Sequence, residues 1–250
     1  MPDPTAFPSD AYLLVSHGSR DPRPAIAADQ LAQNLTQRAA HPIIIATAAL
    51  EFADRPLHQQ ILQLCDRLPA NSVLHIVPLF LLSGVHVRED VPGEVELAQR
   101  QTDVSLHLTP HLGRSPLMPA TLEQLFQTHG VDSASGRILL SHGSRRPGGN
   151  QDAIALAEHL GARLAYWSIE PHLAAQVAHF VHIGQRNITV VPYFLFPGGI
   201  TDAIAQQVAQ LQATYANVEI TMTPILSESA GFAALVAEST GLSPAPVSQR

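Results

Sequence analysis

The chain has 250 residues, so it is long enough to bury one large core or two of ordinary size. Its formal net charge is −7, and only 14% of its residues are charged. All 14 basic residues are arginine, and the absence of lysine excludes a P-loop ATPase and every Schiff-base or pyridoxal enzyme. The single cysteine excludes an internal disulfide framework and a cysteine-ligated cluster held by one chain, and the negative charge argues against a nucleic-acid binder.

In the first half, short apolar runs alternate with longer helical patterns. Four strands are predicted, at Tyr12–Ser16, Ile43–Leu50, Val73–Phe80 and Val104–Leu108. They are continuous apolar runs, which is typical of strands buried on both faces of a parallel sheet. Between the second and third strands, Pro56–Leu68 carries its apolar residues on one face. This spacing predicts a helix and places Cys65 in the core.

The second half repeats this scheme. Its predicted strands are Arg137–Ser141, Leu164–Ser168, Ile188–Leu195 and Val218–Met222. Alternation of strands and helices throughout predicts an α/β doubly wound fold, formed twice: two tandem domains, each a four-stranded parallel sheet flanked by helices. The tail from Gly241 to Arg250, with two prolines and two serines, is predicted to be disordered.

An internal repeat supports this division. The run SHGSR occurs at Ser16–Arg20 and again at Ser141–Arg145. A second similarity between the halves is that of Val77–Leu81 (VPLFL) to Val191–Leu195 (VPYFL). Repetition of this kind indicates two related halves. The polar segment 129–136 is the predicted linker, which gives domains at 1–130 and 131–250.

No segment has the features of a targeting or membrane signal. The stretch Met1–Asp10 contains no basic residue, unlike the start of a signal peptide. The most apolar stretch, Ile76–Val87, is interrupted by polar residues and a proline and is far shorter than the roughly 20 residues of a spanning helix. We therefore expect a cytoplasmic protein that binds neither membrane nor nucleic acid.

The candidate functional residues follow the predicted strands, because ligands of parallel sheets bind beyond the carboxyl ends of the strands. They are His17 to Arg20 after the first strand, Glu51 to Asp54 after the second, and Ser83 to His86 after the third. Imidazoles with carboxylate support suit Fe(II), Co(II) or Ni(II), and a neutral imidazole also accepts protons near pH 7.

Each of these residues alone has a structural interpretation. A histidine at a strand end is more often a hydrogen-bonded structural residue than a ligand, and a lone carboxylate can simply favour a helix start. Three such groups at three successive strand ends favour a site. A hydrolase is disfavoured because neither Ser16 nor Ser19 lies in a G-x-S-x-G elbow. We interpret His75 and His107, inside strands, as structural.

Three ordered motifs resemble the signatures of the sirohydrochlorin chelatase family, the ATP-independent chelatases of the siroheme and cobalamin pathways. They are Leu14–Arg23 (LVSHGSRDPR), Leu50–Pro56 (LEFADRP) and Val77–Pro92 (VPLFLLSGVHVREDVP). The resemblance covers nearly the whole chain, since the second half is similar to the duplicated long form of the family. It implies insertion of Fe(II), Co(II) or Ni(II), as metal substrate, into sirohydrochlorin, with no permanently bound cofactor.

The resemblance also implies roles for individual residues. His17 and His86 would bind the metal, His17 would accept protons, and Glu51 would be the active-site carboxylate. The expected substrate contacts are Asp54, Leu81, Leu82, Ser83, Gly84 and Val85. Sirohydrochlorin bears eight carboxylates, and guanidinium groups hold carboxylates in bidentate fashion. Arginines flank the motifs at positions suited to this, namely Arg20, Arg23, Arg88, Arg145 and Arg146.

The second half departs from the pattern. It keeps His142 and Glu170, but aligning Pro78 with Pro192 places Ile200 where His86 lies. We therefore expect one complete site, in the first half. The chain also lacks the His-rich tail and the Cys-x-x-Cys motif of some long family members, which leaves the metal open. A non-catalytic tetrapyrrole or metal carrier is the alternative function, and monomer and homodimer remain equally open.

Overall fold

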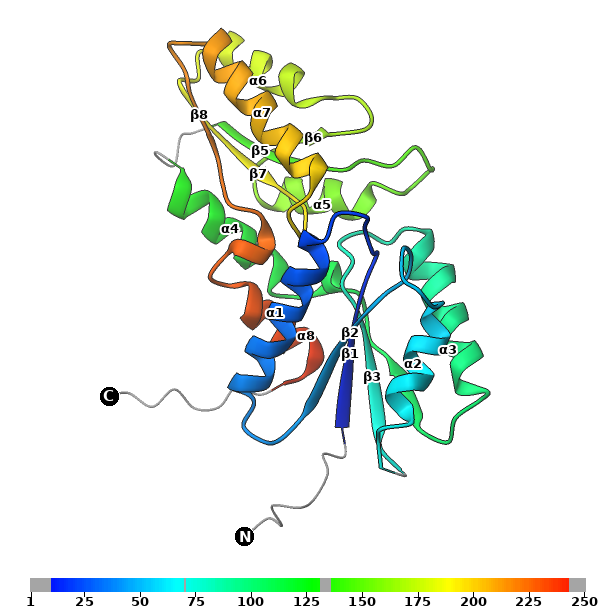
Figure 1. The fold of residues 1–250 in the computed structure, drawn as a ribbon. Helices are drawn as coiled ribbons and strands as arrows, with labels where there is room; N and C mark the ends of the chain where they lie inside the picture. The colour runs from blue at the N-terminus through cyan, green and yellow to red at the C-terminus, as the bar shows by residue number, and fades with distance from the viewer. Residues whose placement is uncertain (1–9, 70, 131–135, 243–250) are drawn as a thin grey trace, which may run out of the picture. The chain divides into compact units, whose positions relative to one another are not determined.

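The computed structural model describes residues 10–69, 71–130 and 136–242. Two parallel sheets of four strands form its framework (Figure 1). The first sheet has the order β2-β1-β3-β4, formed by β1 (Asp10–Ser16), β2 (Ile44–Ala49), β3 (Val73–Pro78) and β4 (Ser105–Leu108). The second has the order β6-β5-β7-β8, formed by β5 (Gly136–Ser141), β6 (Arg163–Tyr166), β7 (Asn187–Pro192) and β8 (Glu219–Met222). The expected α/β fold with two parallel sheets is thus confirmed.

Helices cover both faces of each sheet. They are α1 (Arg23–Arg38), α2 (Leu57–Cys65), α3 (Val91–Gln99), α4 (Met118–His129), α5 (Gln151–His159), α6 (Leu173–His182), α7 (Gly199–Thr214) and α8 (Phe232–Thr240). One core packs α2 and α3 against the first sheet, and Cys65 belongs to it as expected. A matching core packs α6 and α7 against the second sheet.

The compact units do not follow the expected domains 1–130 and 131–250. One unit comprises residues 1–115 and 233–250, and the other comprises 116–232. Helix α4, from the first half, thus belongs with the second sheet, where Arg137 of β5 bonds Glu123 of α4. Helix α8, from the end of the chain, belongs with the first sheet, where Glu238 accepts a hydrogen bond from Ser115. Sequence periodicity identifies a helix but not the sheet on which it packs, and this explains the difference.

Two expectations fall partly outside the described residues. The predicted linker spans 129–136, of which 131–135 are not described, and most of the tail at 241–250 is also outside the description. Over the ranges that are described, the structure contains no helix of the length and apolarity that membrane crossing requires.

The strand order creates the position for a site. In the first sheet the chain passes from β1 to β2 on one side, and then returns to form β3 on the other side of β1. Such a reversal leaves a crevice at the carboxyl ends of the two strands that flank it, here β1 and β3. His17 directly follows β1, and the loop that leads to His86 follows β3.

Candidate metal centre

His17 and Glu51 are held side by side because the pairing of β1 with β2 continues past the strands. The backbone N–H of Leu50 donates to the carbonyl oxygen of Ser16 (2.9 Å), and the N–H of Glu51 donates to the carbonyl oxygen of His17 (2.9 Å). His17 Nε2 lies 3.8 Å from Glu51 Oε2, and each side chain is a little under half exposed. The two groups therefore share a position open to solvent at the edge of the sheet.

Gly18 makes this close approach possible. A Cβ built on Gly18 would lie 1.9 Å from the carbonyl oxygen of Glu51, and the residue has a φ of +91°. Glycine satisfies both demands, because it has no Cβ and adopts positive φ freely. The glycine next to the first histidine is thus explained by packing within the protein rather than by approach of a ligand.

His86 reaches the same edge from a π-helical turn, His86–Asp90, that leads into α3. The turn is closed by a hydrogen bond from the Val91 N–H to the His86 carbonyl. Pro92 follows at the start of α3; its ring has no N–H and would crowd the carbonyl four residues earlier, so the helix widens there. π-helical turns of this kind are frequent at functional sites.

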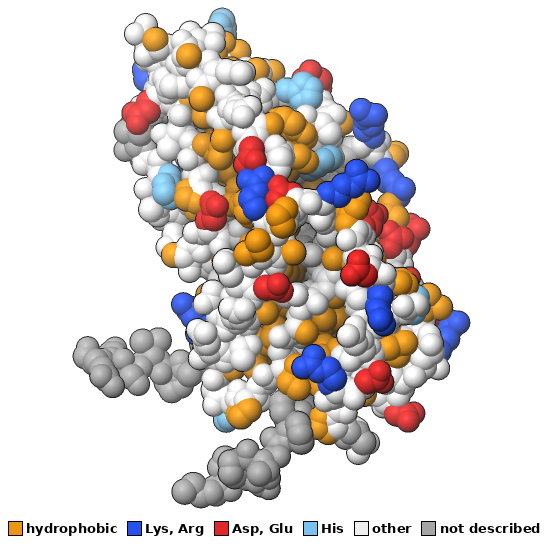
Figure 2. Space-filling model, in the orientation of Figure 1, with side chains coloured by type: hydrophobic (Ala, Val, Ile, Leu, Met, Phe, Trp, Pro, Cys, Tyr) orange, Lys and Arg blue, Asp and Glu red, His pale blue; other side chains and the backbone are white. Residues whose placement is uncertain are grey.

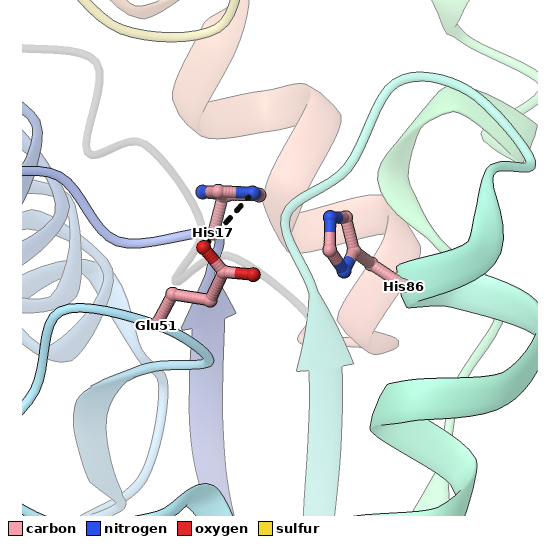
Figure 3. Close-up of side chains that lie close together, drawn as sticks. All are labelled: His17, Glu51 and His86. Carbon is pink, nitrogen blue, oxygen red and sulfur yellow. Dashed lines mark ion pairs between the residues drawn. The ribbon is translucent and has the colours of Figure 1, made fainter.

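The three predicted site residues come together (Figure 3). One ligand atom from each of His17, Glu51 and His86 can be chosen so that all lie within 4.8 Å of one another. The two imidazole rings stand nearly perpendicular, with centroids 4.7 Å apart, and the ring of Phe80 lies 6.5 Å from that of His17 and 6.2 Å from that of His86. Two nitrogens and a carboxylate at this spacing are a donor set suited to a borderline divalent metal.

Hydrogen bonds leave the same nitrogen free on both rings. Nδ1 of His17 lies 3.1 Å from the carbonyl oxygen of Gly18, and Nδ1 of His86 lies 2.7 Å from Oδ2 of Asp90. Carbonyl and carboxylate oxygens only accept hydrogen bonds, so both Nδ1 atoms donate. Each Nε2 then carries the lone pair that a metal or a proton requires.

The predicted substrate contacts follow the same three strands as this cluster but are not part of the group that could hold a metal. The guanidinium carbon of Arg20 lies 5.5 Å from the ring centroid of Phe52, an exposed aromatic with a φ of +56°. Asp54 is exposed. Within the loop of residues 81–85, Ser83 Oγ lies 3.0 Å from Nε2 of His111, and no atom lies within 4 Å of where a Cβ on Gly84 would stand.

Two residues near the site are not among those that the sequence patterns singled out. Asp90 stands four positions after His86, which is a visible helical spacing, but it is absent from the predicted set. His111 follows β4, is buried, and anchors the loop by contacts with Ser83 and with the Phe80 carbonyl. Extending the strand-end argument to the fourth strand would have pointed to His111.

The described part of the second half lacks this cluster, and one expectation about it is wrong. His142 repeats the geometry of His17, with Nδ1 3.0 Å from the Gly143 carbonyl oxygen. The residue whose N–H donates to the His142 carbonyl is Ser168, so Ser168, not Glu170, is the counterpart of Glu51. Glu170 instead lies 3.6 Å from His172. Aligning the two halves by sequence misses this shift of two residues because strand register is not visible in the motifs.

The strand register supports the expectation that Ile200 takes the position of His86 in the second half. Pro78 pairs with Val15, and Pro192 pairs with Leu140, so counting forward from the two prolines places Ile200 at the position of His86. In the described residues, the group that could hold a metal is the one formed by His17, Glu51 and His86.

The fold and the site together define a class: a duplicated, doubly wound α/β protein with a candidate metal centre at one switch point. The CbiX family model matches residues 11–129 and again 136–241, so it covers both halves. The chain belongs to the CbiX family.

Relatives with assigned names agree with this membership. The chain is 27% identical over 213 residues to a sirohydrochlorin ferrochelatase of Priestia megaterium, covering 81% of this chain and 79% of the relative. It is 23% identical over 226 residues to a sirohydrochlorin cobaltochelatase of the same organism, covering 84% of this chain and 72% of the relative. Both relatives are thus matched over most of their length.

Solved structures share the fold. SirB from Bacillus subtilis with Fe3+ superposes with a TM-score of 0.71 at 21% identity, covering 92% of this chain and 95% of SirB. The structure described as CbiX, the terminal enzyme for biosynthesis of siroheme in denitrifying bacteria, superposes with a TM-score of 0.66 at 20% identity. The match covers 94% of this chain and 100% of that structure's chain.

Proposed function

We propose that this chain is a sirohydrochlorin chelatase, which inserts Fe(II) or Co(II) into sirohydrochlorin without ATP. The observation that carries the proposal is the convergence of His17, Glu51 and His86 within 4.8 Å, in a chain whose curated relatives are named sirohydrochlorin ferrochelatase and cobaltochelatase. With the metal as substrate, the chain needs ligands that hold it briefly and a group that takes protons from the macrocycle.

Metal binding falls to the two Nε2 atoms and the carboxylate. His17 and His86 supply neutral nitrogen ligands, and Glu51 supplies charge that offsets the dication. All three side chains are partly exposed, so the metal can enter from solvent. A site of two imidazoles and one carboxylate leaves coordination positions open, and pyrrole nitrogens can occupy these as the metal is transferred.

Proton removal is the second requirement. The incoming dication replaces two pyrrole N–H protons, so the reaction yields the metal complex and two protons. When the metal leaves His17, its Nε2 becomes free to accept one of them. Glu51, 3.8 Å away, stabilises the resulting imidazolium, which then releases the proton to solvent water. The second proton follows the same route once the ring is neutral again.

The remaining predicted residues belong to substrate binding. Arg20 would pair with a carboxylate of the macrocycle, and the loop at 81–85 and Asp54 would contact its edge. Gly84 supports this arrangement, because the space beside it is open and a large planar ligand can approach the backbone there.

Charges are interspersed on the face drawn in Figure 2, where arginine and acidic side chains alternate on both units. Arg20, whose guanidinium lies over the ring of Phe52 in the loop that also holds Glu51, carries the argument for carboxylate recognition. Cytoplasmic location, and the absence of nucleic-acid and membrane partners, stay predictions, as do Ni(II) as a substrate and the oligomeric state.

The test is anaerobic incubation of the full chain with sirohydrochlorin and each of Fe(II), Co(II) and Ni(II), followed by the visible spectrum of the macrocycle. A chelatase accelerates the spectral change well beyond the rate without protein, and His86→Ala removes most of the acceleration. A protein that binds cobalt or sirohydrochlorin tightly, yet leaves the insertion rate unchanged, is a carrier and contradicts the proposal.

A further inference from the structure

The side chain of Asp90 makes the shortest polar contact of the metal centre. Its Oδ2 lies 2.7 Å from Nδ1 of His86, and both side chains are partly exposed. A neutral imidazole in water has two tautomers, and only the one with hydrogen on Nδ1 presents Nε2 as a ligand. The Asp90 carboxylate accepts the Nδ1 hydrogen and so favours the tautomer that leaves Nε2 for the metal.

The local backbone brings this pair together. His86 and Asp90 are the first and last residues of the π-helical turn, where four-residue spacing still places both side chains on the same side. The turn exists because Pro92 widens the helix just before α3. The sequence H-V-R-E-D-V-P thus encodes the metal ligand, its hydrogen-bond acceptor and the proline that shapes the turn between them.

The other imidazole is held differently. His17 donates its Nδ1 hydrogen to the neutral carbonyl of Gly18 at 3.1 Å, whereas His86 donates to an anionic carboxylate. Hydrogen bonds to charged groups are about twice as strong as those between neutral groups, and a carboxylate behind an imidazole makes it a stronger donor to metal.

We propose that Asp90 is a positioning residue for the metal: it fixes the tautomer and orientation of His86 and makes it the stronger of the two imidazole ligands. The inference rests on the proposed function in taking the cluster as the metal site. Asp90 does not touch the metal in this account; it acts through the ring of His86. His17, with its weaker acceptor, is then the ligand that gives up the metal and takes the proton.

The first measurement needs no metal and no tetrapyrrole. Long-range proton–nitrogen correlation spectra of the 15N-labelled full chain, at about pH 8.5 where imidazoles are neutral, report the tautomer of each histidine, and the signal missing in His86→Ala identifies His86. We expect the Nδ1–H tautomer in the parent and in Asp90→Asn, whose amide oxygen still accepts. In Asp90→Ala we expect a shift towards the Nε2–H form.

The second measurement is cobalt binding by calorimetry, with the visible bands of Co(II) as a signature of its coordination. Asp90→Ala should weaken binding by about 10- to 100-fold, the usual effect of removing such a partner, and Asp90→Asn should recover part of it. Glu89→Ala is the matched control, since Glu89 is an exposed acid of the same turn. It should leave the tautomer unchanged and cobalt affinity within about twofold.

The outcomes separate this proposal from the proposed function. An unchanged His86 tautomer in Asp90→Ala, or equal cobalt affinities for Asp90→Ala and Glu89→Ala, overturns the role of Asp90 while insertion activity still stands. If the parent binds cobalt with the expected Asp90 dependence but does not accelerate insertion, the chelatase proposal fails and the role of Asp90 remains. Should Asp90→Ala fail to fold, the near-isosteric Asp90→Asn carries the test: it must keep the Nδ1–H tautomer and bind cobalt more weakly than the parent.

Discussion

The turns after β1 and β5 are nearly identical, yet among the described residues only the first belongs to a group that could hold a metal. His17 and His142 both place Nδ1 about 3 Å from the carbonyl of the following glycine, and both glycines have positive φ. The run SHGSR therefore forms the same turn after both strands, whether or not a metal ligand set is completed around it. Its chemistry depends on residues that two other strand ends supply.

Those other residues have structural roles in the second half. Ser168, the counterpart of Glu51, donates its hydroxyl to the His142 carbonyl at 2.9 Å. Ile200, the counterpart of His86, packs against the apolar core of the second sheet. Where the first half has two of the proposed ligands, the second half thus has a hydrogen bond and a core contact, while His142 has the same Nδ1 contact as His17.

The largest expected effect tests this asymmetry directly. His17→Ala should lower the insertion rate by about 1,000-fold, because it removes both a metal ligand and the proton acceptor. His142→Ala should change the rate by about threefold at most, since within the described ranges His142 is not part of a group able to hold a metal. Initial rates with cobalt and sirohydrochlorin check both. Equal losses would mean that both halves take part in the chemistry.

A second comparison concerns the glycines. Gly18→Ala should reduce the free energy of unfolding by about 3 kcal/mol or more, because the new Cβ would meet the backbone of Glu51 at 1.9 Å. Gly143→Ala should cost less, about 2 kcal/mol, because its Cβ would meet side-chain atoms, Ile169 Cγ1 at 2.8 Å and Tyr166 Cβ at 3.0 Å, which can shift more easily than backbone.

Amide hydrogen exchange, measured peptide by peptide, reports the local stability around each substituted glycine. It does not require the two units to unfold in a single transition. Faster exchange is expected around β1 and β2 for Gly18→Ala, and a smaller change around β5 and β6 for Gly143→Ala. The reverse order would show that the clash at Gly18 relaxes without cost.

Much of this comparison is visible in the sequence, for identifiable reasons. Continuous apolar runs predict buried parallel strands, and residues after parallel strands converge on one edge, so the sequence alone groups His17, Glu51 and His86. It does not identify the counterpart of Glu51, because the choice between Glu170 and Ser168 depends on strand register, which composition does not encode. The exchange of α4 and α8 between units is also hidden, since both helices are amphipathic and neither pattern specifies a partner sheet.

The third prediction restores what the second half has lost. The double variant Ser168→Glu/Ile200→His should raise cobalt stoichiometry in calorimetry from one to two per chain, because His142 already presents Nε2. The second equivalent should bind about 10- to 100-fold more weakly, because the residue four positions after 200 is the buried Ile204, which cannot act as Asp90 does. Ile200→His alone is the control and should leave one strong equivalent. A stoichiometry of one in the double variant would show that the two edges differ in shape as well as in residues.

The smallest expected effect concerns an ion pair of the second unit. By strand register, Arg137 of β5 occupies the position of Tyr12 in β1. Its guanidinium bonds both carboxylate oxygens of Glu123 on α4, at 2.8 and 3.1 Å. Burial raises the pKa of Glu123, but the hydrogen bonds from Arg137 and Gln127 outweigh it and leave the pKa below its usual value.

A carboxyl group whose pKa is lowered on folding stabilises the protein above its unfolded pKa, and the contribution disappears as pH falls through the folded pKa. Glu123→Gln should therefore cost about 1 kcal/mol at pH 7, since the pair is partly exposed, and the cost should shrink as the pH falls below about 4. Trp167 is the single tryptophan and lies in the second unit, so urea unfolding followed by its fluorescence reports this unit. Glu96→Gln, which breaks the exposed pair with Arg100 in the first unit, is the control and should leave that transition unchanged. A cost for Glu123→Gln that stays constant down to pH 3 would assign the effect to packing of α4 rather than to charge.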